Sequence, residues 1–227
     1  MSIKTGWSQL FNSNQQIRIT SLHPRYFGAL SELQYACFPT VHEDEYYRHE
    51  HFASHYQIFP EGSFVVLVKD GEQEQVIGFG SGIFIGFDFA HPHHSSVEIS
   101  GNGMYTTHDP DGDWYYAVDL GVHPDYRRRG IGRKLYETRK ALVRRHNKRG
   151  IVAGGILSDY SKVRDQFSVA VYAQQVVAGT LYDSTLSFQL NNGFTYHGLI
   201  ENYVPNDAED MATLLVWHNP NYHPPAP

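Results

Sequence analysis

The sequence of 227 residues predicts one mixed α/β domain of the α+β type, and three observations lead to this prediction. Apolar residues make up 41% of the chain and aromatic residues 14%, which supports a sizeable core and excludes intrinsic disorder. Strand-like and helix-like patterns of apolar residues alternate along the chain. No run of ~18 uncharged apolar residues occurs, so we expect no transmembrane helix.

The N-terminal half is expected to hold one strand, two helices and a β-hairpin. The alternation at 17–20 predicts a short strand, and Pro24 is suited to open a helix that ends near Phe38. The polar and aromatic run 43–56 contains neither Gly nor Pro and predicts a second helix. Strands are predicted at 63–70 and 76–85, joined by an acidic turn.

The C-terminal half is expected to alternate strands and helices. A strand at 114–122 leads into a helix at 130–147, where Ile131, Leu135 and Leu142 mark one apolar stripe. The remaining predicted elements are a strand at 150–157, an inserted helix at 168–178, a short helix at 184–192 capped by Asp183, and strands at 194–200 and 211–217.

The long segment 88–113 has no predicted element but holds four histidines, namely His91, His93, His94 and His108. Segments of this length inside a compact domain are usually functional. With Asp109 these histidines would offer three metal ligands, but their irregular spacing and flanking prolines favour a polar, solvent-facing loop and no metal site. Residues 109–113 resemble a calcium loop only superficially, because the twelfth position is Leu120 and not Glu.

Positive charge is concentrated in one segment. Residues 127–149 carry a local charge of +10, whereas the rest of the chain carries −16. A solvated helix face would be enough to explain the positive charge of residues 127–149, but it would not explain the contrast with the rest of the chain. The contrast favours a polyanionic small ligand at this segment and a cationic substrate elsewhere, and it argues against a nucleic-acid partner.

A phosphate-binding turn is predicted between the strand at 114–122 and the helix at 130–147. Free N–H groups and the positive dipole end of a helix favour a pyrophosphate there. Gly130 and Gly132 let the backbone approach the anion closely. Four arginines around them are suited to contact phosphate oxygens: Arg127, Arg128, Arg129 and Arg133. The dinucleotide-binding and Walker patterns do not fit these residues.

The residues Arg127-Arg128-Arg129-Gly130-Ile131-Gly132 resemble the acyl-CoA signature of the GNAT N-acetyltransferase superfamily, Arg/Gln-x-x-Gly-x-Gly/Ala. Leu190-Asn191-Asn192-Gly193-Phe194 is similar to that family's closing helix. The resemblance covers about 17–218, leaving 1–16 as an N-terminal extension and 219–227 as a Pro-rich tail. It implies a mixed, mostly antiparallel sheet of about seven strands, splayed between strands four and five.

The resemblance also implies acetyl-CoA as cofactor. Backbone groups of Leu120 and Val122 match the positions that pair with the pantetheine arm. Amides from Arg128 to Arg133 match those that hold the pyrophosphate. The chain further resembles a subgroup whose relatives are fused to a carbon–nitrogen hydrolase.

Catalytic residues are less clearly marked. Asp119 matches a substrate-side acid that holds an ammonium or acts as base, and Tyr116 matches a position where some members carry their base. A tyrosine is a poor base at neutral pH, so Tyr116 is expected to shape the pocket. Gln189 stands where the family's general-acid tyrosine commonly lies, so Tyr182 or Tyr172 must replace it, or the thiolate leaves to solvent.

The function implied is acetyl transfer from acetyl-CoA to a primary amine of a small molecule, with 158–182 and 88–113 walling the acceptor pocket. The alternatives are a protein or peptide N-acetyltransferase, or a GNAT-like module that binds acyl-CoA without turnover. The lone Cys37 and the start of the chain, which has no apolar leader, predict a cytoplasmic protein without a membrane partner. The 16 tyrosines leave a homodimer possible.

Overall fold

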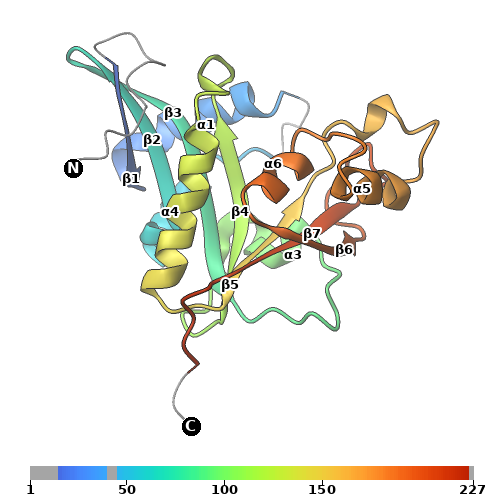
Figure 1. The fold of residues 1–227 in the computed structure, drawn as a ribbon. Helices are drawn as coiled ribbons and strands as arrows, with labels where there is room; N and C mark the ends of the chain where they lie inside the picture. The colour runs from blue at the N-terminus through green and yellow to red at the C-terminus, as the bar shows by residue number, and fades with distance from the viewer. Residues whose placement is uncertain (1–14, 40–44, 225–227) are drawn as a thin grey trace, which may run out of the picture. The chain divides into compact units, whose positions relative to one another are not determined.

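The computed structural model describes residues 15–39 and 45–224, in which seven strands form one sheet of order β1-β2-β3-β4-β5-β7-β6 (Figure 1). Strands β4 and β5 pair in parallel. The pairs β1–β2, β2–β3, β5–β7 and β6–β7 are antiparallel. The mixed α+β fold with seven strands is therefore confirmed.

The strands are β1 (Gln15–Ser21), β2 (Ser63–Asp70), β3 (Gln73–Ile85), β4 (Trp114–Val122), β5 (Gly150–Gly155), β6 (Thr195–Ile200) and β7 (Ala212–His218). The helices are α1 (Phe27–Cys37), α2 (His49–Ile58), α3 (Ser96–Ser100), α4 (Ile131–Arg145), α5 (Val169–Val177) and α6 (Leu186–Asn191). Every predicted strand has a counterpart within a few residues of its expected bounds.

Helix α2 begins later than the predicted 43–56. Arg48 is extended, with φ −103° and ψ 179°, so the helix cannot include it. Its N–H donates to Nδ1 of His51 at 3.0 Å, a side-chain contact that closes the start of the helix. Residues 43 and 44 lie outside the described part of the chain.

The segment 88–113 is not wholly irregular, because it contains α3, which is followed by a turn with left-handed backbone at Gly101, Asn102 and Gly103. Ser95 and Glu98 form a capping box: the Glu98 N–H donates to Ser95 Oγ, and Glu98 Oε2 accepts from the Ser95 N–H. The spacing Ser-x-x-Glu was the sequence signal that would have predicted this helix.

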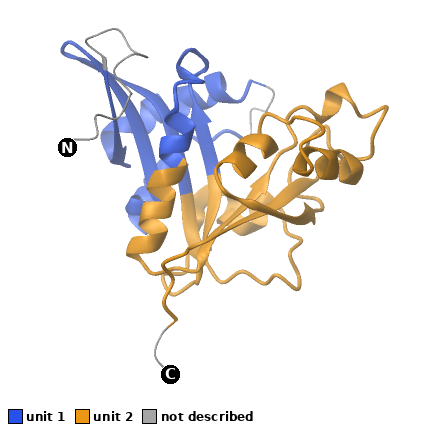
Figure 2. Ribbon diagram, viewed as in Figure 1, with its two compact units in different colours: residues 1–81, 119–135 blue, residues 82–118, 136–227 orange. Residues whose placement is uncertain are grey.

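The chain divides into two compact units, shown in blue and orange in Figure 2. Unit 1 comprises 1–81 and 119–135, and unit 2 comprises 82–118 and 136–227. In unit 1, α1 and α2 pack against β2 and β3 through a core that includes Leu30, Phe52 and Leu67. In unit 2, the core joins β4, β5 and β7 through Tyr116, Val152 and Leu214.

The Pro-rich tail starts with ordered contacts in unit 2. The Asn219 N–H donates to the Arg149 carbonyl at 2.8 Å. Asn147 and His223 exchange two hydrogen bonds, of 2.7 and 2.9 Å. The first residues of the tail are therefore tied to the turn between α4 and β5.

Candidate functional site

The parallel ladder between β4 and β5 is short. It pairs Trp114–Ala117 with Gly150–Ala153 and stops there, although β4 continues to Val122 and β5 to Gly155. The backbone groups of Leu120 and Val122 thus lie beyond the paired part of β4. We call the stretch around Ala117 and Ala153 the ladder end.

In unit 1, the segment 127–133, which we call the basic turn, leads from β4 into α4. Arg127 is extended, whereas Arg128 and Gly130 have left-handed backbones with φ 58° and 77°. Such alternation turns successive N–H groups toward one side, which favours an anion. The first-turn N–H groups of α4 have no acceptor within the helix, and no side chain of the described residues accepts from Ile131, Gly132 or Arg133.

Arg127 uses its side chain to brace the turn. Its Nε donates to the Val122 carbonyl and its guanidinium to the Cys37 carbonyl, each at 3.0 Å. These bonds tie the C-terminus of α1 to the end of β4. Arg128 and Arg133 are exposed, and the Arg129 guanidinium lies 5.1 Å from the centre of the Tyr126 ring.

Asp119, the predicted substrate-side acid, is half-buried in unit 1. Its Oδ2 accepts from Nε2 of Gln34, a buried residue of α1, at 3.3 Å. Burial, with a smaller contribution from the Asp119 charge, raises the pKa of the nearby Cys37 thiol to about 12. Cys37 is therefore a neutral core residue, and Asp119 is a half-buried acid held by Gln34.

Tyr116 is fully buried in unit 2. Its hydroxyl lies 2.7 Å from His94 Nε2 and 3.3 Å from the Tyr203 hydroxyl. Burial raises the pKa of Tyr116 well above its ordinary value, and Tyr203 adds to this effect. Tyr116 is thus held in the protonated form.

Two adjacent glycines mark where side chains crowd against β5. A Cβ at Gly154 would lie 2.7 Å from the Tyr203 hydroxyl. A Cβ at Gly155 would lie 2.5 Å from Gln189 Oε1, a buried oxygen without a hydrogen-bond partner among the described residues. The Gly-Gly pair inside a strand was the sequence signal for this close approach.

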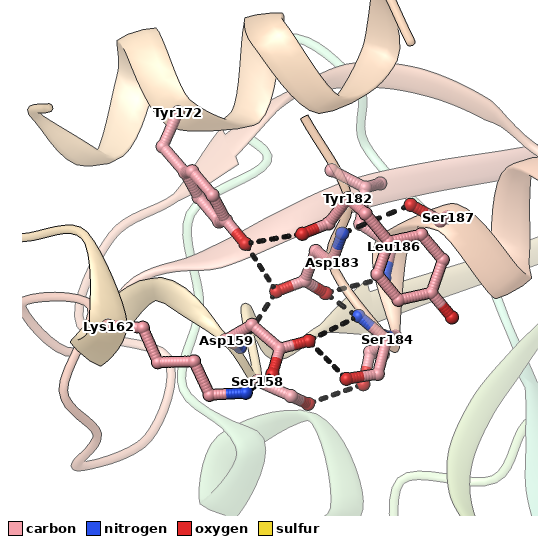
Figure 3. Close-up of polar contacts among 10 residues, drawn as sticks. Ser158, Asp159, Lys162, Tyr172, Tyr182, Asp183, Ser184, Leu186 and Ser187 are labelled. Carbon is pink, nitrogen blue, oxygen red and sulfur yellow. Dashed lines mark hydrogen bonds and ion pairs between the residues drawn. The ribbon is translucent and has the colours of Figure 1, made fainter. Parts of the chain in front are cut away.

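The two tyrosines considered as replacements for Gln189 differ sharply. The Tyr172 hydroxyl is 3.2 Å from Oδ2 of Asp183 and from the Tyr182 carbonyl (Figure 3). Burial raises the pKa of Tyr172, and the Asp183 carboxylate raises it further. The Tyr182 side chain is 69% exposed.

Around Tyr172, the two ends of the insert 158–182 are joined by polar contacts (Figure 3). We call this group of side chains the polar clasp; it consists of Asp159, Lys162, Tyr172, Asp183 and Ser184. Asp183 is fully buried and accepts from the N–H groups of Asp159, Thr185 and Leu186 at 2.8–2.9 Å. Asp159 in turn accepts from the Ser184 N–H at 2.7 Å and pairs with Lys162. These contacts fix the insert to the start of α6.

The histidines of 88–113 have separate partners. His91 pairs with Asp88 on the surface, while His93 Nδ1 accepts from the Glu201 N–H at 3.2 Å. His94 and His108 are half-buried and directed inward, so the expectation of a uniformly solvent-facing loop is wrong. Across residues 15–39 and 45–224, no group of three or more His, Cys, Asp or Glu is placed to hold a metal ion.

Comparisons with a family model and with a curated relative both point to one family. The model of the acetyltransferase (GNAT) family matches residues 27–161. An uncharacterized N-acetyltransferase, YkwB of Bacillus subtilis (strain 168), is 30% identical over 85% of this chain and 84% of its own length. The probable hydrolase YhcX of the same strain is 38% identical over 91% of this chain, which spans only 39% of that relative.

Solved structures share the fold at low identity. The GphF GNAT-like decarboxylase in complex with isobutyryl-CoA has a TM-score of 0.76 at 23% identity, covering 88% of this chain and 98% of its own. The loading GNATL domain of CurA from Lyngbya majuscula has a TM-score of 0.75 at 16% identity, covering 89% and 98%. Among the described residues, no helix has the length and apolar character needed to span a membrane.

Proposed function

Because the chain belongs to the acetyltransferase (GNAT) family, we propose that it transfers an acetyl group from acetyl-CoA to a primary amine of a small molecule. The basic turn is the observation that carries this proposal. It combines left-handed backbone at Arg128 and Gly130 with the open N-terminus of a 15-residue helix. That arrangement suits a pyrophosphate and needs few side chains.

Each predicted cofactor residue has a distinct part in this proposal. N–H groups from Arg128 to Arg133 would hold the pyrophosphate, and the exposed Arg128 and Arg133 would add charge. Arg127 would act by bracing the turn, since its side chain already bonds two carbonyls. Backbone groups of Leu120 and Val122 would pair with the pantetheine arm because they lie beyond the ladder end.

The chemistry needs a group that meets the substrate ammonium. Acetyl-CoA supplies the acyl carbon and a thiolate leaving group when it is bound. Asp119 would hold the ammonium or take its proton. The hydrogen bond from Gln34 to its Oδ2 would fix the orientation of the carboxylate. Tyr116 and Tyr172 keep their protons in buried hydrogen bonds, so we propose that the thiolate is protonated by solvent.

The acidic balance outside the basic turn supports an amine acceptor. Residues outside 127–149 carry −16, so they attract a cationic acceptor and repel an acidic one. We propose that the segments 158–182 and 88–113 wall the acceptor pocket. The polar clasp and the inward-facing His94 give these segments a defined shape.

A second candidate is decarboxylation of an acyl-CoA that carries a further carboxylate. It is supported by the TM-score of 0.76 to a GNAT-like decarboxylase, against 0.51–0.54 for several acetyltransferase structures. Gln189 at the place of the usual tyrosine also favours it, since no thiolate leaves in a decarboxylation and the carbanion left by carbon dioxide takes its proton from solvent.

Titration calorimetry with acetyl-CoA tests the cofactor first. The control is a Gly130→Trp variant, whose added side chain should block the basic turn. Micromolar binding by the parent and none by the folded variant is expected. Transfer assays would then compare small amines with peptides, and a malonyl thioester of CoA would test decarboxylation. Asp119→Asn should lower amine transfer at least tenfold, while the exposed Asp125→Asn should not. No binding by the folded parent would overturn the proposal.

A further inference from the structure

Unit 1 contains a cavity of about 470 Å³ that the proposed function does not use. It lies between one face of the helical segment 25–36 and the start of β3. His123, which follows β4, also lines it. Within the described part of the chain, the lining includes neither Asp119 nor any residue assigned to the cofactor. The cavity is therefore a separate candidate binding site.

Apolar side chains form much of the cavity wall. Ala29 and Ala36 of α1 lie two helical turns apart, so they face the same side, and their small side chains leave room for a ligand. Leu67 of β2 and Val76 of β3 are direct partners in the antiparallel ladder and line the cavity together with Leu33. A ligand that fits this wall needs an apolar body.

Positive charge predominates near the start of α1. Arg25 lines the cavity, and its guanidinium lies 4.6 Å from the centre of the Tyr26 ring. Glu74 also lines the cavity but is held by Arg18, whose Nη2 lies 2.7 Å from Glu74 Oε1. This hydrogen bond lowers the pKa of Glu74, and the charges of Arg18 and Arg25 lower it further. Two arginines thus face one ionised glutamate, which leaves a positive charge for a ligand carboxylate.

Negative charge lies further along α1. Glu32 is exposed and lines the cavity, and no side chain of the described residues forms an ion pair or hydrogen bond with it. Two helical turns separate Glu32 from Arg25, so their backbones are about 10 Å apart. Ala29 lies between them on the same side of the helical segment. A ligand that meets both charges therefore needs its own two charges at the ends of an apolar chain.

We propose that this cavity binds an ω-amino acid, a small molecule with a carboxylate and an ammonium at the two ends of an alkyl chain. The carboxylate pairs with Arg25 and the ammonium pairs with Glu32. The alkyl chain packs on Ala29 and Leu33. A simple amine or a simple acid leaves one of the two protein charges without a partner. The site is independent of the proposed function and does not rest on it.

Titration calorimetry at low ionic strength tests the charge arrangement. 6-Aminohexanoate carries both charges at the ends of its chain, hexylamine and hexanoate carry one charge each, and glycine carries both charges close together. 6-Aminohexanoate should bind with a Kd of about 1 mM or lower, and each of the other compounds should bind about tenfold more weakly or not at all. No binding of 6-aminohexanoate, or equal binding of hexylamine, would overturn the proposal.

Substitutions at exposed positions then locate the binding without disturbing the core. Arg25→Gln and Glu32→Gln should each weaken 6-aminohexanoate binding about tenfold. Ala29→Phe should abolish it, because the ring would occupy the space between the two charges. The matched controls Lys69→Gln and Glu72→Gln remove exposed charges outside the cavity and should keep the parent affinity. Equal losses in the controls would refute the site, because binding would then depend only on net charge.

An ω-amino acid is also a primary amine, so the cavity must be distinguished from an acceptor site. Asp119→Asn should bind 6-aminohexanoate with the parent affinity, and Ala29→Phe should keep the parent Kd for acetyl-CoA. If Asp119→Asn loses 6-aminohexanoate and Ala29→Phe retains it, the amine binds as an acceptor at Asp119 and the cavity proposal fails. If the parent does not bind acetyl-CoA, the proposed function fails, and the titrations with 6-aminohexanoate still decide the cavity.

Discussion

The basic turn and the polar clasp both lead a loop into a helix, and they treat the helix N-terminus in opposite ways. At α6, the Asp183 carboxylate accepts the N–H groups of Thr185 and Leu186 and also that of Asp159. At α4, no side chain of the described residues accepts from the first-turn N–H groups of Ile131 to Arg133. One helix start is satisfied by its own chain, and the other remains available to an external anion.

The side-chain charges also differ between the basic turn and the polar clasp, and only those of the basic turn favour an external anion. The basic turn contains four arginines and no acid, whereas the polar clasp joins two aspartates with one lysine. We infer that the clasp serves stability and the basic turn serves binding. Substitutions in the basic turn should therefore change affinity more than stability, and substitutions in the clasp should do the reverse.

The largest effect is expected at Gly130. Its φ of 77° disfavours any L side chain, and a β-branched one most of all. Gly130→Val should weaken acetyl-CoA binding about 100-fold or more, because the turn would lose the conformation that directs its N–H groups. Titration calorimetry measures the change.

Gly71→Val is the matched control for this prediction. Gly71 has a φ of 61° in the β2–β3 turn, and a Cβ there would contact nothing within 4 Å. Both variants carry similar backbone strain, so both should melt at lower temperature, but only Gly130→Val should lose binding. Equal loss of affinity in the two variants would contradict a specific role for the basic turn.

The next effect is expected at Asp183. Removing its buried carboxylate in Asp183→Ala leaves three N–H groups without their acceptor, and the Tyr172 hydroxyl keeps only the Tyr182 carbonyl. The free energy of unfolding should fall by about 3 kcal/mol, the cost of several unmet buried donors. Chemical denaturation measures it, with the exposed Asp165→Ala as a near-neutral control. Retained binding of acetyl-CoA by folded Asp183→Ala would support the division between the two regions.

Local patterns were enough to predict most of the fold. The hairpin of β2 and β3, the apolar stripe of α4 and the glycines of the basic turn each follow from residues close in sequence. Arg127 was expected to reach phosphate, yet its side chain bonds a carbonyl 90 residues away. Nothing local to Arg127 indicates that partner.

The polar groups near the ladder end were harder to predict for the same reason. Tyr116 and Tyr203 are 87 residues apart, and His94 reaches Tyr116 from a different segment. The sequence marks these residues only as aromatic or polar. Their hydrogen-bond directions arise from the tertiary packing, which decides whether a tyrosine is a base, a donor or a core residue.

A smaller, two-sided effect distinguishes the arginines of the basic turn. Arg128→Ala should weaken acetyl-CoA binding about tenfold and leave stability almost unchanged, since its exposed side chain is free to add charge at the phosphate. Arg127→Ala should lower the free energy of unfolding by about 1 kcal/mol, because two hydrogen bonds to carbonyls are lost. Calorimetry measures the affinity of both variants and chemical denaturation measures their stability. The reverse pattern would assign Arg127 to the phosphate.

The smallest effect is a pH dependence at the clasp. Burial tends to raise the pKa of Asp159, but hydrogen bonds from Lys162 and Ser184 outweigh it and hold that pKa below its ordinary value. A carboxylate with a depressed pKa stabilises the fold above the pKa of the unfolded chain, near 4. That stabilisation disappears as pH falls through the lower, folded value.

Asp159→Asn should therefore cost about 0.5–1 kcal/mol at pH 7, and the difference from the parent should shrink as the pH falls below about 4. Denaturation curves at several pH values measure this difference. The pH dependence of acetyl-CoA binding should be the same in both proteins, because Asp159 bonds Lys162 and Ser184 within the polar clasp. If Asp159→Asn changed affinity as much as stability, the clasp would be part of the binding machinery, and the contrast between the two helix starts would fail.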